Sequence, residues 1–330
     1  MTSRYPVMDP IDELTFGYRT AQVVFTASRL GIFVQLGRDT LSLETLAQRA
    51  RVTPRGLRIL CDALVSLALL RKTEAGYQNT ETALEYLLPD SPKSKTAILY
   101  HNATLYETWG RLYDVVKEGK PVDRSQIADD LQGSEATFAA AMADVARFSA
   151  RDTVRLLDLS SCQSLLDAGG GPGLYAIEFA RQNPHLQAVI MDNEATLAVA
   201  RENIHHAGLE GQVRTRPGDV LRDPLGGPYT MIFASNLIHA FSYDENQNFV
   251  RRCAEALEPG GRLCLKDFYL EDDRTAPMAN TLFAVNMLVN TEGGDCYTFA
   301  EAHEWLAQAG LTPEETVRQT PISSLVIGRK

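Results

Sequence analysis

Three acidic residues follow successive apolar runs in the second half of the sequence. Asp167 starts the glycine-rich stretch DAGGGPG, Asp192 closes QAVIMD, and Asp219 lies in RPGDVL. Carboxylates at the ends of neighbouring strands can accept hydrogen bonds from hydroxyls and amines, and they can neutralise a cation. The chemistry they indicate is the binding of a ligand that carries hydroxyls, amines and positive charge.

The glycine spacing separates two classes of ligand. Gly169, Gly171 and Gly173 follow the pattern G-x-G-x-G, not the G-x-G-x-x-G of dinucleotide-binding enzymes. A pyrophosphate favours basic or neutral surroundings, whereas this rim is acidic. S-adenosylmethionine fits better, because Asp192 can accept from ribose hydroxyls and Asp219 can reach the adenine amine. A glycine turn with incidental surface acids is the alternative interpretation.

These residues need a scaffold that brings strand ends together. From residue 164 onward, apolar runs alternate with helical segments, which is typical of a parallel sheet covered by helices on both faces. Ligands of such sheets bind beyond the carboxyl ends of the strands, near the switch in strand order. The predicted strands are 164–169, 187–192, 213–219, 229–235, 261–270 and 323–330.

The first 90 residues have a different rhythm. Helices are predicted over 21–36, 41–52 and 53–70, with Ser42 as a cap, and a small hairpin follows around Glu74-Ala75-Gly76. This is the pattern of a winged helix, for which DNA binding is the usual function. Six Lys/Arg against two Asp/Glu in 41–72 support that function. The segment TPRGLRILCD, however, offers few polar side chains for base edges, so a structural or dimerising module is favoured.

Composition limits the class of protein. The chain has 330 residues, 45% apolar and 22% charged, which is enough for two domains with hydrophobic cores. No apolar run approaches the roughly 18 residues of a membrane span, so we expect a cytoplasmic protein without a membrane partner. The net charge of −10 argues against nucleic acid as the main partner. Five scattered cysteines without a CxxC pair argue against disulfides and a metal site.

Taken together, these motifs resemble a known family. LLDAGGGPG, MDN, PGDVL, ASNLIHAFSYDE, LEPGGRLCLKDFYL and NMLVNTEGGDCYTFAEAHEWLAQAG occur in this order after the winged helix. They are similar to class I S-adenosylmethionine-dependent methyltransferases of the plant caffeate and hydroxyindole O-methyltransferase type. The resemblance implies an α/β fold: a Rossmann-like seven-stranded sheet with helices on both faces, preceded by a mainly helical winged-helix domain that forms a homodimer. It implies a dimerisation domain over 1–90, a helical connector contributing to the substrate pocket over 91–158, and a cofactor-binding domain over 159–330.

The resemblance extends to individual positions. Contacts to S-adenosylmethionine, or to its product S-adenosylhomocysteine, are implied for Asp167, Gly169, Gly171, Gly173, Asp192, Asn193, Asp219, Val220, Ser235 and Phe148. A pocket for a small, flat, largely apolar acceptor is implied for Met142, Phe283, Met287, Asn290 and Thr291, with core packing as the alternative. The general base of the family corresponds to His239 in NLIHAFS, and an acid beside it corresponds to Asp267 in LKDFY.

Two departures from the family pattern bear on His239. The second acid of the family falls on Cys296, next to Asp295, and the aspartate after the histidine is Ala240. Complete proton transfer from a phenol to an imidazole is roughly 5 kcal/mol uphill. We therefore expect O-methylation of an acidic acceptor, such as an enol or polyketide phenol. The alternatives are a packing role for His239, C- or N-methylation or non-methylating chemistry on the same fold, and a winged-helix regulator that senses a small molecule.

Overall fold

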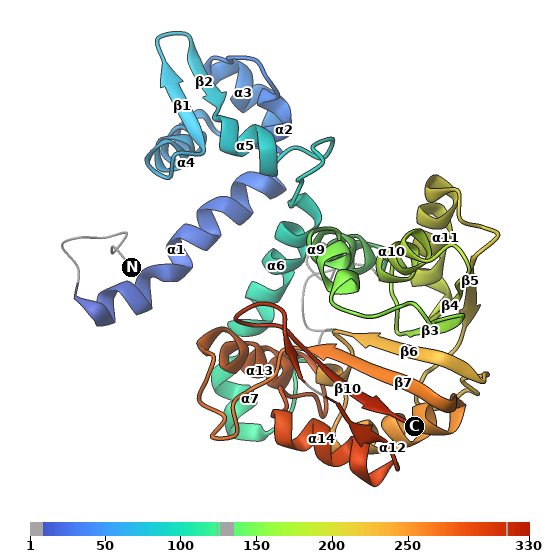
Figure 1. Cartoon of the computed structure of the whole chain (residues 1–330). Helices are drawn as coiled ribbons and strands as arrows, with labels where there is room; N and C mark the ends of the chain where they lie inside the picture. The colour runs from blue at the N-terminus through green and yellow to red at the C-terminus, as the bar shows by residue number, and fades with distance from the viewer. Residues whose placement is uncertain (1–8, 124, 126–134, 315) are drawn as a thin grey trace. The chain divides into compact units, whose positions relative to one another are not determined.

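The structure is a computed structural model that describes residues 9–123, 125, 135–314 and 316–330. The chain divides into two units, Met1–Tyr106 and Glu107–Lys330. Figure 1 labels the helices and strands. None of the described helices is long and apolar enough to cross a membrane.

Helices and one hairpin make up the first unit. Its elements are α1 (Pro10–Arg29), α2 (Ile32–Leu36), α3 (Leu43–Ala50), α4 (Pro54–Ser66), β1 (Leu70–Thr73), β2 (Gly76–Asn79), α5 (Glu81–Tyr86) and most of α6 (Thr96–Trp109). Their apolar side chains form one core, which includes Leu36, Leu46, Leu57, Leu64 and Tyr77.

The predicted hairpin is confirmed. β1 and β2 pair antiparallel with Thr73 opposite Gly76, so Glu74 and Ala75 form the turn. Gly76 has a φ of +134°, and a Cβ at this position would collide with the carbonyl oxygen of Leu41. A side chain at position 76 is therefore excluded both by the backbone conformation and by the space available.

The predicted cap of α3 is also confirmed, because the Ser42 hydroxyl accepts a hydrogen bond from the amide of Thr45 at 3.2 Å. The prediction of one helix over 21–36 is wrong. α1 begins at Pro10 and ends at Arg29, and Gly31, with a φ of +66°, separates it from α2. A residue in the left-handed region cannot continue a right-handed helix, so the apolar periodicity runs across a break.

Part of the basic charge of the first unit is neutralised within it. The carboxylate of Asp62 on α4 accepts from Lys72 at 2.7 Å, from the hydroxyl of Tyr77 at 2.7 Å and from Arg58 at 3.1 Å. Two of the six basic side chains in 41–72 thus have an acidic partner. This arrangement weakens the argument for DNA binding from charge alone.

The second unit alternates strands and helices. Its elements are α7 (Leu112–Glu118), α9 (Glu135–Arg155), β3 (Ser164–Ala168), α10 (Leu174–Gln182), β4 (Gln187–Asp192), α11 (Glu194–Ala207), β5 (Val213–Pro217), β6 (Tyr229–Ser235), η2 (Ile238–Ala240), α12 (Tyr243–Ala256), β7 (Leu257–Asp267), α13 (Met278–Asn290), α14 (Phe299–Gln308), β8 (Thr312–Pro313), β9 (Val317–Arg318) and β10 (Ser324–Arg329).

The strand order of the sheet is β5-β4-β3-β6-β7-β10-β8, with β9 also paired to β10. The first five of these strands run parallel. The chain passes from β3 to β4 and β5 on one side and then returns to β6 and β7 on the other. The strand order therefore reverses between β3 and β6, and their carboxyl ends mark where ligands bind in such sheets.

The last strand departs from the expected parallel sheet, because β10 runs antiparallel to β7. β9 is also antiparallel to β10, because only residues 319–323 connect these two strands and so short a connection cannot make the crossover that parallel neighbours require. β8 and β9 pair with the same edge of β10. Together they occupy the place of one edge strand, which gives the predicted seven-stranded arrangement.

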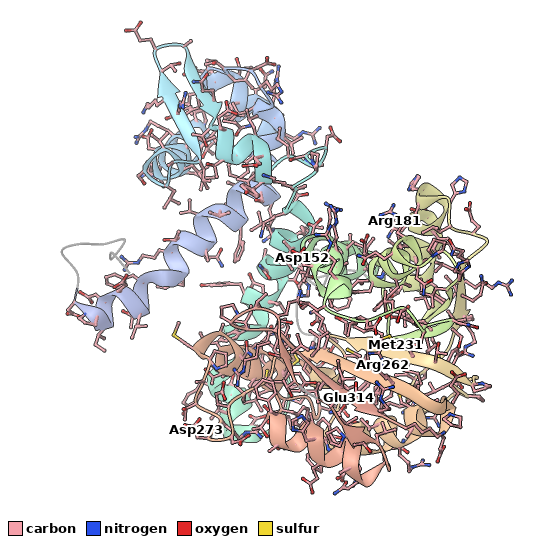
Figure 2. All side chains as sticks on the ribbon, in the orientation of Figure 1. Asp152, Arg181, Met231, Arg262, Asp273 and Glu314 are labelled. Carbon is pink, nitrogen blue, oxygen red and sulfur yellow. The ribbon has the colours of Figure 1, made fainter. Side chains whose placement is uncertain are left out.

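Helices cover both faces of the sheet (Figure 1). On one face α9, α10 and α11 share a core with Leu165, Phe179 and Phe233. On the other face α12 and α14 pack through Phe249 and Trp305. Figure 2 shows the side chains that fill these layers, and its labelled Met231 and Arg262 are Cα partners on β6 and β7.

Candidate active site

The glycine loop joins β3 to α10 at the point of reversal. Gly169, Gly171 and Gly173 have φ values of +66°, +56° and +78°, which L side chains rarely adopt. A Cβ on Gly171 would meet no other atom within 4 Å. The loop therefore has an open side on which a ligand can lie against the main chain.

Hydrogen bonds and close packing hold this loop in place, and they involve two residues that the sequence interpretation missed, Gly170 and Asn203. The amide of Gly171 donates to the carboxylate of Asp192 at 2.9 Å, and Asn203 on α11 donates to the carbonyl of Pro172 at 2.8 Å. A Cβ on Gly170 would lie 2.6 Å from Cγ of Asp167. The run of three glycines was a signal for Gly170, whereas nothing in the sequence singled out Asn203.

Asp167 lies at the end of β3 and is only 1% exposed. Neither of its carboxylate oxygens has a hydrogen-bond partner of normal geometry among the described residues. Burial is the main cause that raises the pKa of this carboxyl to about 7; the amide of Ala176 partly offsets it, and the charge of Asp192 adds a smaller contribution. Buried carboxylates without donors are costly. A cationic ligand group with N–H donors would satisfy these oxygens.

Asp192 and Asn193 connect β4 to α11. The carboxylate of Asp192 accepts from the amides of Gly171 and Asn193, the latter at 2.7 Å. These two contacts hold the carboxylate of Asp192 beside the glycine loop. The side-chain oxygen of Asn193 caps α11 by accepting from the amide of Thr196 at 2.9 Å. In this structure the side chain of Asn193 thus stabilises the helix that follows Asp192.

Asp219 and Val220 follow β5. The carboxylate of Asp219 is 42% exposed and accepts from the amide of Leu221 at 2.8 Å. The side chain of Val220 is buried in the core on the α12 face, so a contact between Val220 and a ligand would come from its main chain.

Ser235 and Asn236 follow at the end of β6. The hydroxyl oxygen of Ser235 is buried and has no partner among the described residues. Asn236 has a φ of +53° and turns the chain toward η2. Unsatisfied polar atoms at the ends of both β3 and β6 are what a site for a polar cofactor would leave in the free protein.

His239 and Asp267 form a hydrogen-bonded pair of titratable groups. Nδ1 of His239 lies 2.7 Å from Oδ1 of Asp267, which also accepts from the amide of Phe268 at 2.8 Å. Burial opposes the ionisation of Asp267, but His239 and its hydrogen bond outweigh burial and lower the pKa of the carboxyl. An ionised carboxylate only accepts hydrogen bonds, so in the neutral form of the imidazole Nδ1 carries the proton and Nε2 is the acceptor.

Two phenylalanines fix the ring of His239, whose side chain is 14% exposed. The ring of Phe283 meets it edge-on at 4.9 Å between centroids, and Phe268 stacks at 6.0 Å. Gly294 packs behind, where a Cβ would collide with the carbonyl oxygen of His239. The pair predicted from the resemblance is therefore brought together on a rigid support, and Gly294 is a supporting residue that the sequence interpretation missed.

The structure supplies one acid to His239. Asp295 turns away, since its carboxylate accepts from Arg274 at 2.5 Å and from the amide of Cys296 at 2.7 Å. Cys296 is fully buried, and burial together with the charges of Asp267 and Asp295 raises the pKa of its thiol far above the usual range. The thiol is therefore neutral, and it does not replace a second carboxylate.

The predicted pocket residues on α13 differ in their surroundings. Phe283 contacts His239, as described, whereas Met287 is 6% exposed. Thr291 donates to the carbonyl of Met287 at 2.8 Å. Asn290 donates to the carbonyl of Asn286 at 2.9 Å, and its own side-chain oxygen is buried without a described partner. α13 therefore offers both an apolar wall and one unsatisfied acceptor.

The remaining predicted residues lie on α9. Met142 is half-buried there, and the side chain of Phe148 lies outside the described residues. All five cysteines are free and buried. Within the described ranges, no group of three or more His, Cys, Asp or Glu is arranged to hold a metal ion.

Comparison with known families identifies the chain. The sequence signature of an O-methyltransferase domain matches residues 109–312, and that of an O-methyltransferase dimerisation domain matches residues 12–89. The chain belongs to the O-methyltransferase family. Both the predicted family and the predicted α/β fold with a helical N-terminal domain are thereby confirmed.

Relatives of this O-methyltransferase span nearly its whole length. It is 29% identical over 315 residues to the 3-hydroxy-5-methyl-1-naphthoate 3-O-methyltransferase of Streptomyces sahachiroi, covering 93% of this chain and 90% of the relative. It is 31% identical over 339 residues to the tetracenomycin polyketide synthesis 8-O-methyl transferase of Streptomyces glaucescens, covering 100% and 99%. The solved structure of human N-acetylserotonin methyltransferase in complex with S-adenosylmethionine is 27% identical, with a TM-score of 0.86 and coverage of 98% and 99%.

Proposed function

We propose that this O-methyltransferase transfers a methyl group from S-adenosylmethionine to a phenolic or enolic hydroxyl of a small, flat, largely apolar acceptor in secondary metabolism. The observation that carries the proposal is the His239–Asp267 pair, which leaves Nε2 of His239 as a proton acceptor beside Phe283. The names of the naphthoate and polyketide relatives support an aromatic acceptor. The structure of the human relative with S-adenosylmethionine supports the methyl donor.

The residues around the glycine loop suit this cofactor. Asp192 accepts the ribose hydroxyls, Asp219 accepts the adenine amine, and the unsatisfied carboxylate of Asp167 accepts the ammonium group. Gly171 lets the ligand approach the main chain. When bound, S-adenosylmethionine supplies a methyl group on a sulfonium, and the chemistry is that of the cofactor. The protein positions the acceptor and removes its proton.

His239 performs the proton transfer in this proposal. Nε2 takes the proton of the acceptor hydroxyl, and the carboxylate of Asp267 stabilises the resulting imidazolium and keeps the ring oriented. Because Asp295 pairs with Arg274 and Cys296 is neutral, no second carboxylate assists. The site therefore suits an acceptor hydroxyl that is more acidic than a simple phenol.

An isotope experiment tests the reaction. Purified enzyme and methyl-labelled S-adenosylmethionine are incubated with a naphthol, an enol and an indole, and the products are analysed by NMR. We expect the label on oxygen of the naphthol or enol. Label on carbon or nitrogen would contradict the proposal in favour of the alternative methyl acceptors.

Melting temperatures measured with and without ligand test the cofactor assignment. S-adenosylhomocysteine is expected to raise the melting temperature of the wild type, because it binds only the folded state. Asp192→Ala is expected to lose most of this shift, whereas Asp152→Ala, an exposed acid on α9 labelled in Figure 2, keeps it. A wild-type shift in Asp192→Ala would show that the ribose assignment is wrong.

We further propose that residues 1–90 form a homodimer, while residues 91–158 act as the connector and 159–330 bind the cofactor. Three large apolar side chains on α1 are well exposed: Ile11 at 66%, Leu14 at 75% and Tyr18 at 51%. Exposed apolar surface of this kind is typical of a protein interface. The match to a dimerisation domain supports the same conclusion.

Light scattering after size exclusion tests the dimer. The wild type is expected to elute as a dimer at micromolar concentration, and Leu14→Glu to shift toward the monomer because it places charge in an apolar interface. Tyr113→Glu, at a 76% exposed position on α7, serves as the control. A monomeric wild type would contradict the dimerising function and would favour DNA binding as the function of this unit. DNA binding would then be tested by its affinity at increasing salt concentration, which is expected to fall steeply.

A further inference from the structure

Lys266, near the end of β7, is a buried cation. It is 3% exposed, and its Nζ donates to the side-chain oxygen of Asn236 at 3.4 Å and lies 5.6 Å from the centroid of the Tyr175 ring. Among the described residues, no carboxylate lies within ion-pair distance of it, although its charge contributes to the lowered pKa of Asp267. Buried ammonium groups are ordinarily paired with a carboxylate, so one long hydrogen bond to an amide leaves most of its capacity unused.

The register of the strands places Lys266 near the cofactor loop. Lys266 is the Cα partner of Ser235 on β6, and Asp167 on β3 is the Cα partner of Phe233. Alternate residues of a strand share a face, so Asp167, Ser235 and Lys266 all lie on the face covered by α9 and α10. Asp267, the next residue, lies on the opposite face with His239.

Two buried groups of opposite sign therefore flank the carboxyl end of β6. With β6 between them, their strands are about 9 to 10 Å apart across the sheet. The unsatisfied hydroxyl of Ser235 lies on the strand between them, and both oxygens of Asp167 lack described partners. The two charges do not pair with each other. A ligand group that carries an ammonium and a carboxylate side by side would satisfy both.

We propose that Lys266 binds the carboxylate of the amino-acid moiety of the cofactor, with Asp167 and Ser235 on the ammonium side. This inference rests on the cofactor site proposed above. A carboxylate on the methyl acceptor is the other source of the same chemistry, and binding measurements without acceptor distinguish the two.

Calorimetry with two ligands tests the proposal. S-adenosylhomocysteine carries the amino-acid moiety, whereas 5′-methylthioadenosine keeps the nucleoside and the sulfur but lacks that moiety. Lys266→Met is expected to weaken the first ligand by about 10- to 100-fold, the effect of losing a hydrogen bond to a charged group. Binding of the second ligand is expected to stay within about twofold. Arg262→Met, on the same strand and labelled in Figure 2, is expected to leave both affinities unchanged.

Other outcomes would contradict either the role of Lys266 or the cofactor site. Equal losses for both ligands, or no loss for either, would overturn the role of Lys266. A melting temperature of ligand-free Lys266→Met well below that of the wild type would also overturn it, because removal of a buried charge that has one long hydrogen bond and no ion pair is expected to preserve or raise stability. Failure of the wild type to bind S-adenosylhomocysteine would instead overturn the cofactor site itself.

Discussion

His239→Ala is expected to lower turnover by about 10²- to 10⁴-fold while the affinity for the cofactor stays nearly unchanged. The imidazole is the only described group that combines a free acceptor nitrogen, a carboxylate partner at 2.7 Å and a position beside Phe283. Steady-state kinetics and calorimetry with S-adenosylhomocysteine measure the two quantities. His205→Ala, whose side chain on α11 is 77% exposed, is the matched control and is expected to behave like wild type.

The loss is expected to depend on the acidity of the acceptor. An acceptor that is already ionised needs no base, so the gap between His239→Ala and wild type is expected to shrink as pH rises or as the acceptor pKa falls. Asp267→Asn is expected to show a smaller loss of the same kind, since the carboxylate orients the imidazole and stabilises its cation. A loss of less than about tenfold in His239→Ala would show that positioning carries the reaction. The C-methylating and non-methylating alternatives would then be favoured.

Asp167→Asn is expected to abolish cofactor binding and yet to stabilise the free protein above neutral pH. Burial holds the pKa of Asp167 at about 7 against an ordinary value of 3.8, so the folded state binds this proton more tightly than the unfolded state. For a raised carboxyl pKa, the wild type loses stability as pH rises from about 4 to 7. At pH 8 the free energy of unfolding of Asp167→Asn is therefore expected to exceed that of the wild type by an amount on the order of 4 kcal/mol.

Chemical denaturation at pH 4.5 and pH 8 measures this difference. The variant is expected to be more stable than the wild type by about 1 kcal/mol at the lower pH and by about 4 kcal/mol at the higher pH. Asp152→Asn, on the exposed side of α9, controls for the loss of one negative charge. A wild type as stable as the variant at pH 8 would show that Asp167 is solvated or paired in solution.

Protonation of Asp167 is also expected to affect cofactor binding. A cationic ligand group binds the ionised carboxylate, so S-adenosylhomocysteine is expected to bind more tightly at pH 8 than at pH 6 and to release up to about one proton at pH 6. Calorimetry in buffers of different ionisation enthalpy detects that release. Absence of proton release at pH 6 would contradict the contact between Asp167 and the ammonium group.

Elements with strong local signals can be predicted from the sequence alone. Ser42 as a cap, the hairpin turn at Glu74-Ala75, and the alternation of strands and helices after residue 164 depend on neighbours within a few residues. The same is true of the glycine loop, because positive φ values demand glycine wherever the loop lies. The break at Gly31 was missed because apolar periodicity continues on both sides of it.

Contacts between side chains that are distant in the sequence depend on the tertiary fold. His239 and Asp267, 28 residues apart in the sequence, form one hydrogen bond because β6 and β7 are neighbours in the sheet. In the sequence the second acid of the family falls on Cys296, with Asp295 adjacent. The fold pairs the carboxylate of Asp295 with Arg274, and burial keeps the thiol of Cys296 neutral. Nothing in the sequence distinguishes Lys266 from the other lysines. Its buried place opposite Ser235 follows from strand register, which depends on contacts between segments far apart in the chain.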